Sequence, residues 1–277
     1  MQLIAESGST KTTWVVLQDG REVERRASVG LNPFYVTSET LHSSITEIFS
    51  AEECLKVEKV HFYGAGCSTK ENVDWLSNEM KQVFTKAQVQ INHDLLAAAR
   101  GSFGSSAGMV AILGTGSNSC LYDGERIVDN VPALGFTLGD EGGGAWIGRQ
   151  ILKARYYREM PADVEAAFDK TFDTNLAEVL HHAYKDELPN RYVASFAPFA
   201  YDHIATPFMR ELVAKSFNAF INAYLVKYKT DQEEVSVVGS IGFYFKDILE
   251  EELGKHGFVL GTVAQSPIEG LIRYHNS

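Results

Sequence analysis

One pattern occurs twice in the 277-residue chain and limits its fold more than any other feature. A short apolar run is followed by a loop rich in Gly, Ser and Thr, a second apolar run, an Asp-Gly pair and a third run. The first copy spans residues 3–23 and the second spans residues 109–128. An Asp-Gly pair between apolar runs is a hairpin signal, so each copy predicts strand, loop, strand, turn and strand. The repeat predicts a duplicated architecture with one unit in each half.

Strands and helices alternate between the two copies. Residues 57–63 and 89–91 are apolar runs of strand length, whereas apolar side chains within 41–49 and 73–83 follow helical spacing. This alternation predicts α/β layering. After the second copy, residues 145–229 are mostly helical, and residues 235–238 predict one more buried strand.

Charge and composition exclude several classes of protein. Subtracting 36 acidic from 25 basic residues gives a formal charge of −11, with 45% hydrophobic residues. These values argue against disorder and against a nucleic-acid surface. ATP is still an admissible ligand, because backbone N–H groups, a helix N-terminus and a divalent metal can supply local positive charge. The length favours two domains.

Cysteine usage and hydropathy predict a cytoplasmic protein. The three cysteines are widely spaced and include no CxxC motif, which supports neither a disulfide framework nor a zinc site. The N-terminus has no basic segment, and no apolar run approaches the about 18 residues that span a bilayer. We therefore expect no membrane partner.

Three small-residue loops are candidates for nucleotide binding. Residues 6–12 combine a glycine, three hydroxyls and a lysine after a strand, the composition of a phosphate loop. This is not a Walker A loop, because Thr10 precedes Lys11 and a strand follows. A polar hairpin turn explains this loop equally well, but a second such loop at residues 114–117 favours a pair of phosphate loops. The turn at residues 239–242 suits close approach by a flat ligand.

Two groups of acidic residues are candidates for chemistry. Asp140 and Glu141 lie among four glycines before a helix expected near Ala145, where capping is the alternative explanation. Asp94 lies where a strand meets a helix and is likewise a candidate N-cap. Ligands of open α/β sheets bind at the carboxyl ends of strands, so Asp94 is also a candidate acceptor of a hydroxyl proton in phosphoryl transfer. Its neighbour His93 is assigned no role.

A further short motif, Gly-Leu-Asn at residues 30–32, lies between the first loop and Asp94. Taken in order, these motifs resemble the BadF/BadG/BcrA/BcrD-type ATPase family, and within it the N-acetylglucosamine kinase branch. The resemblance implies an α/β, two-domain actin-like ATPase (ribonuclease H-like) fold. Each domain would hold a five-stranded mixed sheet flanked by helices, with a nucleotide cleft between domains. The expected domains are residues 1–107 and 108–277, with the last helix able to pack back on the N-terminal domain. The motifs that carry the resemblance are residues 6–12, 30–32, 93–94, 114–117, 139–142 and 238–240.

The resemblance also implies roles for individual residues. Asp94 would be the catalytic base, and Mg²⁺ would be held by ATP phosphates and water with Glu6 nearby. The family loop commonly begins with Asp, and the extra methylene of Glu6 shifts that carboxylate. The residues expected to contact ATP are Ser9, Thr10, Lys11, Thr115, Gly116, Gly239 and Ser240. Those expected to contact the sugar are Asn32, Asp94, Leu134, Gly135 and Asp140.

The implied activity is ATP-dependent phosphorylation of an amino sugar, N-acetylglucosamine, at its 6-hydroxyl. The sequence leaves open N-acetylmuramic acid, glucosamine or another hexose as the acceptor. One alternative is a nucleotide-dependent sensor or scaffold without sugar transfer, in which Asn32 and Asp140 would be turn and cap residues. Another is a dehydratase-activator ATPase, but Cys54, Cys67 and Cys120 offer no suitable pair for an iron–sulfur cluster. The helix-rich second half has enough surface for a homodimer.

Overall fold

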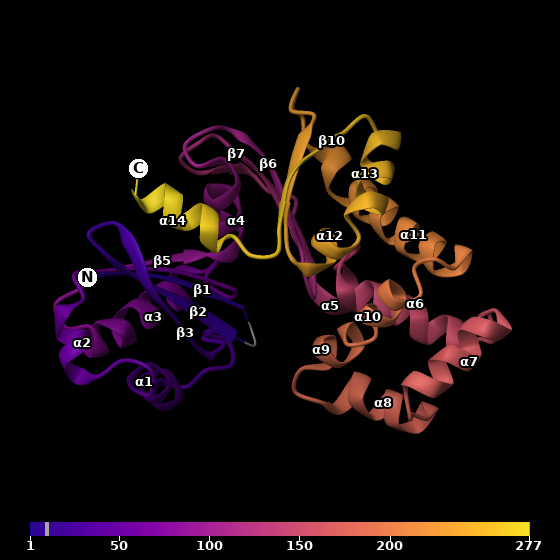
Figure 1. Ribbon diagram of the computed structural model, residues 1–277, viewed down its shortest axis with the longest axis horizontal. Coiled ribbons are helices and arrows are strands. Elements are labelled where there is room, and N and C mark those ends of the chain that lie inside the picture. The colour runs from indigo at the N-terminus through magenta and orange to yellow at the C-terminus, as the bar shows by residue number, and fades with distance from the viewer. Residues whose placement is uncertain (9–10, 277) are drawn as a thin grey trace. The chain divides into compact units, whose positions relative to one another are not determined.

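The computed structural model describes residues 1–8 and 11–276, which form two compact units (Figure 1). Unit 1 comprises Met1–Ser106 together with Pro267–Ser277, and unit 2 comprises Ala107–Ser266. The expected domains divided between residues 107 and 108, and the compact units divide between Ser106 and Ala107. Among the described residues, no helix has both the length and the apolar character needed to cross a bilayer.

Unit 1 is built on a five-stranded mixed sheet with the strand order β3-β2-β1-β4-β5. β1 pairs antiparallel with β2 and parallel with β4, and β4 pairs parallel with β5. The strands are β1 (Gln2–Ser7), β2 (Lys11–Gln18), β3 (Arg21–Val29), β4 (Lys59–Gly64) and β5 (Gln88–His93). The helices are α1 (Ser38–Thr46), α2 (Ala51–Lys56), α3 (Lys70–Val83), α4 (Asp94–Phe103) and α14 (Ile268–Asn276).

The two faces of this sheet bury different cores because successive strand residues point to opposite sides. On one face the fully buried ring of Trp14 contacts Phe49, with ring centroids 5.7 Å apart, and Phe62 and Phe84, each at 6.2 Å. On the other face a smaller cluster, which includes Ile4 of β1, packs against α4 and α14. Each face of the sheet therefore carries a buried hydrophobic cluster.

Helix α14 packs directly on α4 although about 160 residues separate them, as Figure 1 shows. The contact depends on two glycines: a Cβ on Gly270 would lie 1.8 Å from the carbonyl oxygen of Gly101. A side chain at either crossing point would force the helix backbones apart. The last helix thus belongs to unit 1.

Unit 2 repeats this sheet with the strand order β10-β9-β6-β7-β8. β6 pairs antiparallel with β7 and parallel with β9, as β1 does with β2 and β4. The strands are β6 (Gly108–Leu113), β7 (Ser117–Tyr122), β8 (Ile127–Asp129), β9 (Glu234–Val238) and β10 (Val259–Ala264). The predicted α/β duplication and the five-stranded mixed sheets are confirmed, although β10 was not predicted from the residue pattern.

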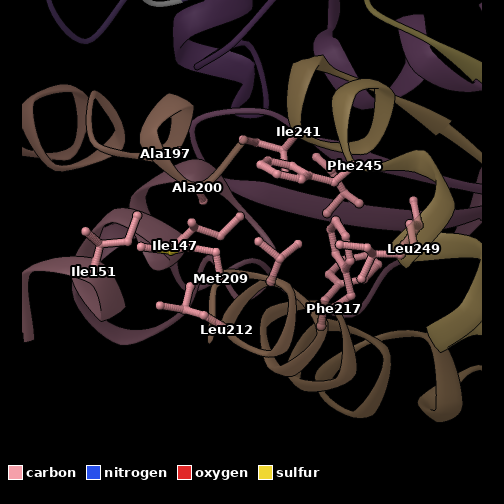
Figure 2. Packing of buried hydrophobic residues seen from close by; sticks show 14 of the residues in the cluster. Ile147, Ile151, Ala197, Ala200, Met209, Leu212, Phe217, Ile241, Phe245 and Leu249 are labelled. Carbon is pink, nitrogen blue, oxygen red and sulfur yellow. The ribbon is translucent and has the colours of Figure 1, made fainter. Parts of the chain in front are cut away.

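The long segment between β8 and β9 is helical, as predicted. Figure 2 shows the core that its helices share with the helices after β9, where Ile147, Met209 and Phe217 pack near Ile241 and Phe245. The helices before β9 are α5 (Gly135–Leu138), α6 (Gly144–Tyr156), α7 (Ala162–Thr171), α8 (Leu176–Lys185), α9 (Pro189–Ala194), α10 (Ala197–Asp202) and α11 (Pro207–Ala223). The short 3₁₀ turn Leu225–Lys227 follows α11, and α12 (Ser240–Tyr244) and α13 (Lys246–Lys255) follow β9.

Candidate functional site

Three strands of unit 1 end side by side. Ser7 of β1 is in register with Gly64 of β4, which is in register with His93 of β5. Because these strands are parallel, the residues that follow them gather at the carboxyl edge of the sheet, where ligands of open α/β sheets bind. Asp94 and Glu6 both lie at this edge.

Asp94 is the first residue of α4, and the structure gives the capping role to His93. The Asp94 carboxylate accepts a hydrogen bond from the N–H of Leu95 at 2.8 Å. Burial raises the pKa of Asp94 above its usual value, against the lowering effects of His93 and of the backbone N–H groups. A carboxylate with a raised pKa at a helix N-terminus is suited to accept a proton.

Glu6 lies on β1 close enough to Asp94 for their charges to interact. Burial, with the nearby Asp94 as a second cause, raises the pKa of Glu6 to about 7, and Lys11 lowers it. Two acidic groups in one partly buried space repel each other when both are ionised, so a cation there would relieve the repulsion.

Carboxylate oxygens are ligands that Mg²⁺ accepts, usually one or two beside substrate phosphates and water. Glu6 supplies such a donor, and it lies close enough to Asp94 and Lys11 for their charges to interact. Across residues 1–8 and 11–276, no group of three His, Cys, Asp or Glu side chains could hold a metal alone. A carboxylate such as that of Glu6 fits a metal that is held mainly by phosphates and water.

Asn32 is held at the same edge of unit 1 by a buried network. The Ser7 hydroxyl oxygen accepts from the N–H of Leu31 at 2.9 Å and lies 2.8 Å from the Thr12 hydroxyl oxygen. Asn32 follows directly, is 6% exposed, and accepts at its Oδ1 from the N–H of Phe34 at 3.0 Å. A Cβ on Gly66 would lie 2.2 Å from that Oδ1, so the glycine after β4 is required for this placement.

In unit 2 the loop between β6 and β7 is fixed by backbone hydrogen bonds. The N–H of Gly114 donates to the carbonyl of Gly116 at 3.0 Å. The N–H groups of Gly144 and Ala145, at the start of α6, donate to the carbonyls of Gly114 and Thr115 at 2.8 Å. The helix start and the loop therefore form one rigid piece, with the Thr115 side chain exposed.

Asp140 lies against this loop and does not cap α6. The residue is 8% exposed, and its Oδ1 accepts from the N–H of Ser117 at 3.3 Å. Burial raises the pKa of Asp140, the Ser117 bond lowers it, and Glu141 raises it. Gly143 is the N-cap of α6 and provides no side-chain bond. Asp140 also adopts a φ of 61°, a left-handed conformation that costs energy for a residue other than glycine.

The turn after β9 lies against the same loop. Gly239 has a φ of 126°, and a Cβ there would lie 2.2 Å from the carbonyl oxygen of Leu113 at the end of β6. Only glycine allows this approach. Gly239 and Ser240 are thereby placed beside Gly114.

A cavity of about 480 Å³ opens within unit 2 next to these turns. The aromatic rings of Tyr201 and Tyr244, 47% and 50% exposed, stand edge to face with their centroids 5.2 Å apart. Small, apolar or aromatic walls around a few hydroxyls suit a flat ring system. The residues around the cavity are Gly114, Thr115, Gly144, Ala194, Ala197, Pro198, Tyr201, Ser240, Ile241, Tyr244 and Phe245.

Leu134 and Gly135 begin the short helix α5 in front of Asp140. The Leu134 side chain is 61% exposed, and Gly135 has a φ of 72°. Arg149 of α6 ties α5 down by donating to the carbonyls of Phe136 at 3.2 Å and Gly139 at 3.3 Å. Leu134 is thus exposed on unit 2, and Gly135 beside it is half-buried.

Comparison with known proteins now identifies the family. The model of the BadF/BadG/BcrA/BcrD ATPase family matches residues 6–255. The chain belongs to this ATPase family. No match was found among curated proteins.

Two solved structures resemble the chain over nearly its whole length. The chain is 35% identical to a protein described as a proposed N-acetylglucosamine kinase from Porphyromonas gingivalis, with a TM-score of 0.94 and coverage of 100% of this chain and 99% of that one. A second protein so described, from Chromobacterium violaceum, is 16% identical, with a TM-score of 0.71 and coverage of 99% and 98%. At that identity the second likeness shows the fold alone.

The fold extends to a family of sugar kinases. A ROK family glucokinase from Streptomyces griseus, solved in complex with glucose and AMPPNP, has a TM-score of 0.60 at 15% identity, with coverage of 99% and 97%. The actin-like ATPase architecture of this family member is therefore established.

The structure groups the expected site residues by unit. Glu6, Lys11, Asn32 and Asp94 belong to unit 1, where Glu6 interacts with both Lys11 and Asp94. Ser9 and Thr10 lie outside the described residues. The remaining expected residues lie in unit 2: Thr115, Gly116, Leu134, Gly135, Asp140, Gly239 and Ser240.

Residue patterns did not reveal the aromatic side of the cavity. Tyr201 and Tyr244 come from α10 and α12, far apart in the sequence, and neither lies in a small-residue loop. A local signal exists for Tyr244, because α12 starts directly after the turn at Gly239 and places this exposed ring close to it.

Proposed function

We propose that this family member is an ATP-dependent kinase that phosphorylates the 6-hydroxyl of an amino sugar, with N-acetylglucosamine as the first candidate. The observation that carries the proposal is the carboxylate of Asp94, with its raised pKa, at the open edge of the unit 1 sheet. The relative that is 35% identical over its full length and is described as a proposed N-acetylglucosamine kinase supports the choice of substrate.

Unit 2 is proposed to bind ATP. The cavity beside Tyr201 and Tyr244 would accept the adenine ring, with Gly239 and Ser240 near the adenosine. Thr115 and Gly116 would contact phosphates, because their loop offers a hydroxyl and a close backbone approach. In the first loop, Ser9, Thr10 and Lys11 would contact phosphates from unit 1.

Asp94 is proposed as the general base. As the sugar oxygen attacks the γ-phosphorus, Asp94 accepts the hydroxyl proton, the new O–P bond forms and the bond to ADP breaks. Burial keeps the Asp94 carboxylate more basic than an exposed one, which favours this transfer near neutral pH. Mg²⁺, held by phosphates with Glu6 nearby, would neutralise phosphate charge when it is bound.

Asn32 and Asp140 are proposed to hydrogen-bond the sugar. Asn32 is nearly buried at the carboxyl edge of the unit 1 sheet, and its Oδ1 accepts from the N–H of Phe34, which orients the amide. One carboxylate oxygen of Asp140 accepts a hydrogen bond from the N–H of Ser117, and the other oxygen would accept one from a sugar hydroxyl. The backbone at Leu134 and Gly135 would complete the sugar contacts.

An ADP-release assay tests the proposed function. The protein is supplied with Mg-ATP and, in parallel, with N-acetylglucosamine, N-acetylmuramic acid, glucosamine or glucose. We expect saturable ADP release stimulated most by N-acetylglucosamine, and phosphorus NMR of the product should show a 6-phosphate. ATP binding without stimulation by any sugar would reject the kinase and favour the sensor alternative.

The dehydratase-activator alternative gains no support from the cysteines. Cys54, Cys67 and Cys120 are all buried, at 5%, 2% and 0% exposure. Burial raises the pKa of Cys67 and of Cys120 to about 12. Protonated thiols inside a core are poor ligands for an iron–sulfur cluster.

A further inference from the structure

We propose that His93 is the positioning residue for Asp94: its neutral imidazole caps α4 and thereby fixes the direction of the catalytic carboxylate. The proposal rests on the proposed function, because it assigns His93 to the same phosphoryl transfer. From the sequence, His93 was assigned no role.

The geometry starts where β5 ends. His93 has the extended backbone of an N-cap, with φ −84° and ψ 160°, and its Nδ1 accepts from the N–H of Leu96 at 3.3 Å. The preceding N–H of the first turn, that of Leu95, donates to the Asp94 carboxylate at 2.8 Å. Two neighbouring side chains therefore share the free amides of one helical turn. The direction of the Asp94 carboxylate depends on where the His93 cap starts that turn.

A histidine is an unusual choice for this position. Among the helix starts that the structure describes, the other side-chain caps come from residue types that cap well, namely Thr37, Ser50, Thr69, Asn175 and Thr206. A hydroxyl or amide oxygen accepts at any pH near neutrality. Imidazole accepts at Nδ1 only when it is neutral and carries its proton on Nε2.

The requirement for a neutral ring has a consequence for the base. A positive charge on His93 lowers the pKa of Asp94 and would make it a weaker proton acceptor. Burial lowers the pKa of His93, Asp94 raises it and Arg100 lowers it, so the balance favours the neutral ring. The cap and the surroundings of His93 thus act in the same direction, and both preserve the basicity of Asp94.

Two substitutions separate positioning from simple stability. His93→Ala removes the cap, whereas His93→Asn supplies a side-chain oxygen that caps well and cannot become charged. We expect His93→Ala to lower kcat for sugar phosphorylation by about tenfold, with KM for ATP within about twofold. His93→Asn should recover at least about a third of the wild-type kcat, because it restores the acceptor.

Ser50→Ala is the matched control. Ser50 caps α2 in the same unit, and its hydroxyl accepts from the N–H of Glu53 at 3.3 Å, the same length as the His93 bond. Loss of the Ser50 cap should lower the midpoint temperature of thermal unfolding and leave kcat unchanged. A kcat for His93→Ala that matches that of Ser50→Ala would overturn the proposal.

Nitrogen NMR of the wild-type imidazoles gives a second readout that needs no activity. The His93 signals are identified by their absence from His93→Asn, and their shifts should show Nδ1 without a proton and Nε2 with one. A protonated Nδ1 at pH 7 would overturn the cap. If His93→Ala does not fold, His93→Asn alone still tests the capping role. A folded His93→Asn variant with less than about a tenth of the wild-type kcat would contradict that role.

The two failures are distinguishable. A wild type that phosphorylates none of the four sugars rejects the proposed function and the positioning role together. A wild type that is active, with an unaffected His93→Ala variant, rejects the positioning role alone.

Discussion

The carboxylate of Asp140 lies against the backbone of Gly116, so that a Cβ on Gly116 would be 2.7 Å from Oδ1. We expect Gly116→Ala to push the carboxylate off the N–H of Ser117 and to lower sugar-dependent ATP turnover by about tenfold or more. Kinetics with the four-sugar panel checks this. The matched variant for stability is Gly114→Ala, which has open space around its Cβ. Equal loss of unfolding free energy in both variants would contradict the contact.

Replacing the proposed base tests the chemistry itself. Asp94→Asn keeps the size of the side chain but leaves no carboxylate to accept the proton. We expect sugar phosphorylation to fall by about a thousandfold, because general-base catalysis contributes about 10²–10⁴. ATP affinity in calorimetry should stay within about threefold, since the cavity lies in unit 2. Near-normal transfer would show that another group takes the proton.

The cavity of unit 2 can be filled without disturbing the core. Ser240 is exposed and lines the cavity, so Ser240→Trp should block a flat ligand while the fold tolerates it. We expect KM for ATP to rise by at least about tenfold, because the indole would occupy the space of the adenine. Fluorescent-nucleotide binding measures the same loss. Ser43→Trp, on the exposed side of α1, is the matched control, and an equal effect there would refute the nucleotide assignment.

The duplicated hairpins could be predicted because alternating apolar residues and Asp-Gly turns are local signals. β10 could not, for reasons visible in its residues. It is an edge strand, only partly buried, with Gly261 inside it and a shift of register between Leu260 and Val263. The residues of such a strand carry no clear apolar alternation, and the strand forms because it pairs with β9.

The candidate site was only partly predictable for a similar reason. Glycines marked the loops near Gly116 and Gly239, since each permits a close approach that a Cβ would prevent. The exchange of capping roles between Asp94 and His93 could not be predicted, because both residue types fit a strand-to-helix junction. Tyr201 and Tyr244 meet only through tertiary packing, which leaves no local pattern.

Acid should destabilise unit 1 through His275. The ring of His275 stacks on that of His61 at 3.8 Å, and its Nε2 lies 3.0 Å from the Tyr63 hydroxyl oxygen. Burial, with His61, Arg100 and Lys59 as further causes, lowers the pKa of His275 from 6.5 to about 3. The unfolded chain therefore binds a proton between these pH values that the folded chain does not. Stability is full above pH 6.5 and is lost as the pH falls toward 3.

The variant His275→Gln isolates this effect. Denaturant unfolding at pH 7 and at pH 4.5 gives the free energy of unfolding at each pH. This free energy should fall less on acidification for His275→Gln than for the wild type, and its slope against pH should differ by about one proton. Titrating groups that do not touch His275 are common to both proteins and cancel in the comparison. Parallel stability curves would mean that His275 is not kept neutral by the fold.

The crossing of α14 over α4 should tolerate no side chain at Gly270. A Cβ there would lie 1.8 Å from the carbonyl oxygen of Gly101, so Gly270→Ala forces the helices apart and loosens the cluster that contains Ile268 and Leu271. We expect a loss of at least about 1–3 kcal/mol in the free energy of unfolding, the usual cost of overpacking. Gly254→Ala in α13 is the control, because its Cβ meets open space and helical alanine is favoured by up to about 1 kcal/mol. In calorimetry, the midpoint temperature of unfolding should therefore fall for Gly270→Ala and rise for Gly254→Ala. A Gly270→Ala protein as stable as the wild type would contradict the tight helix contact.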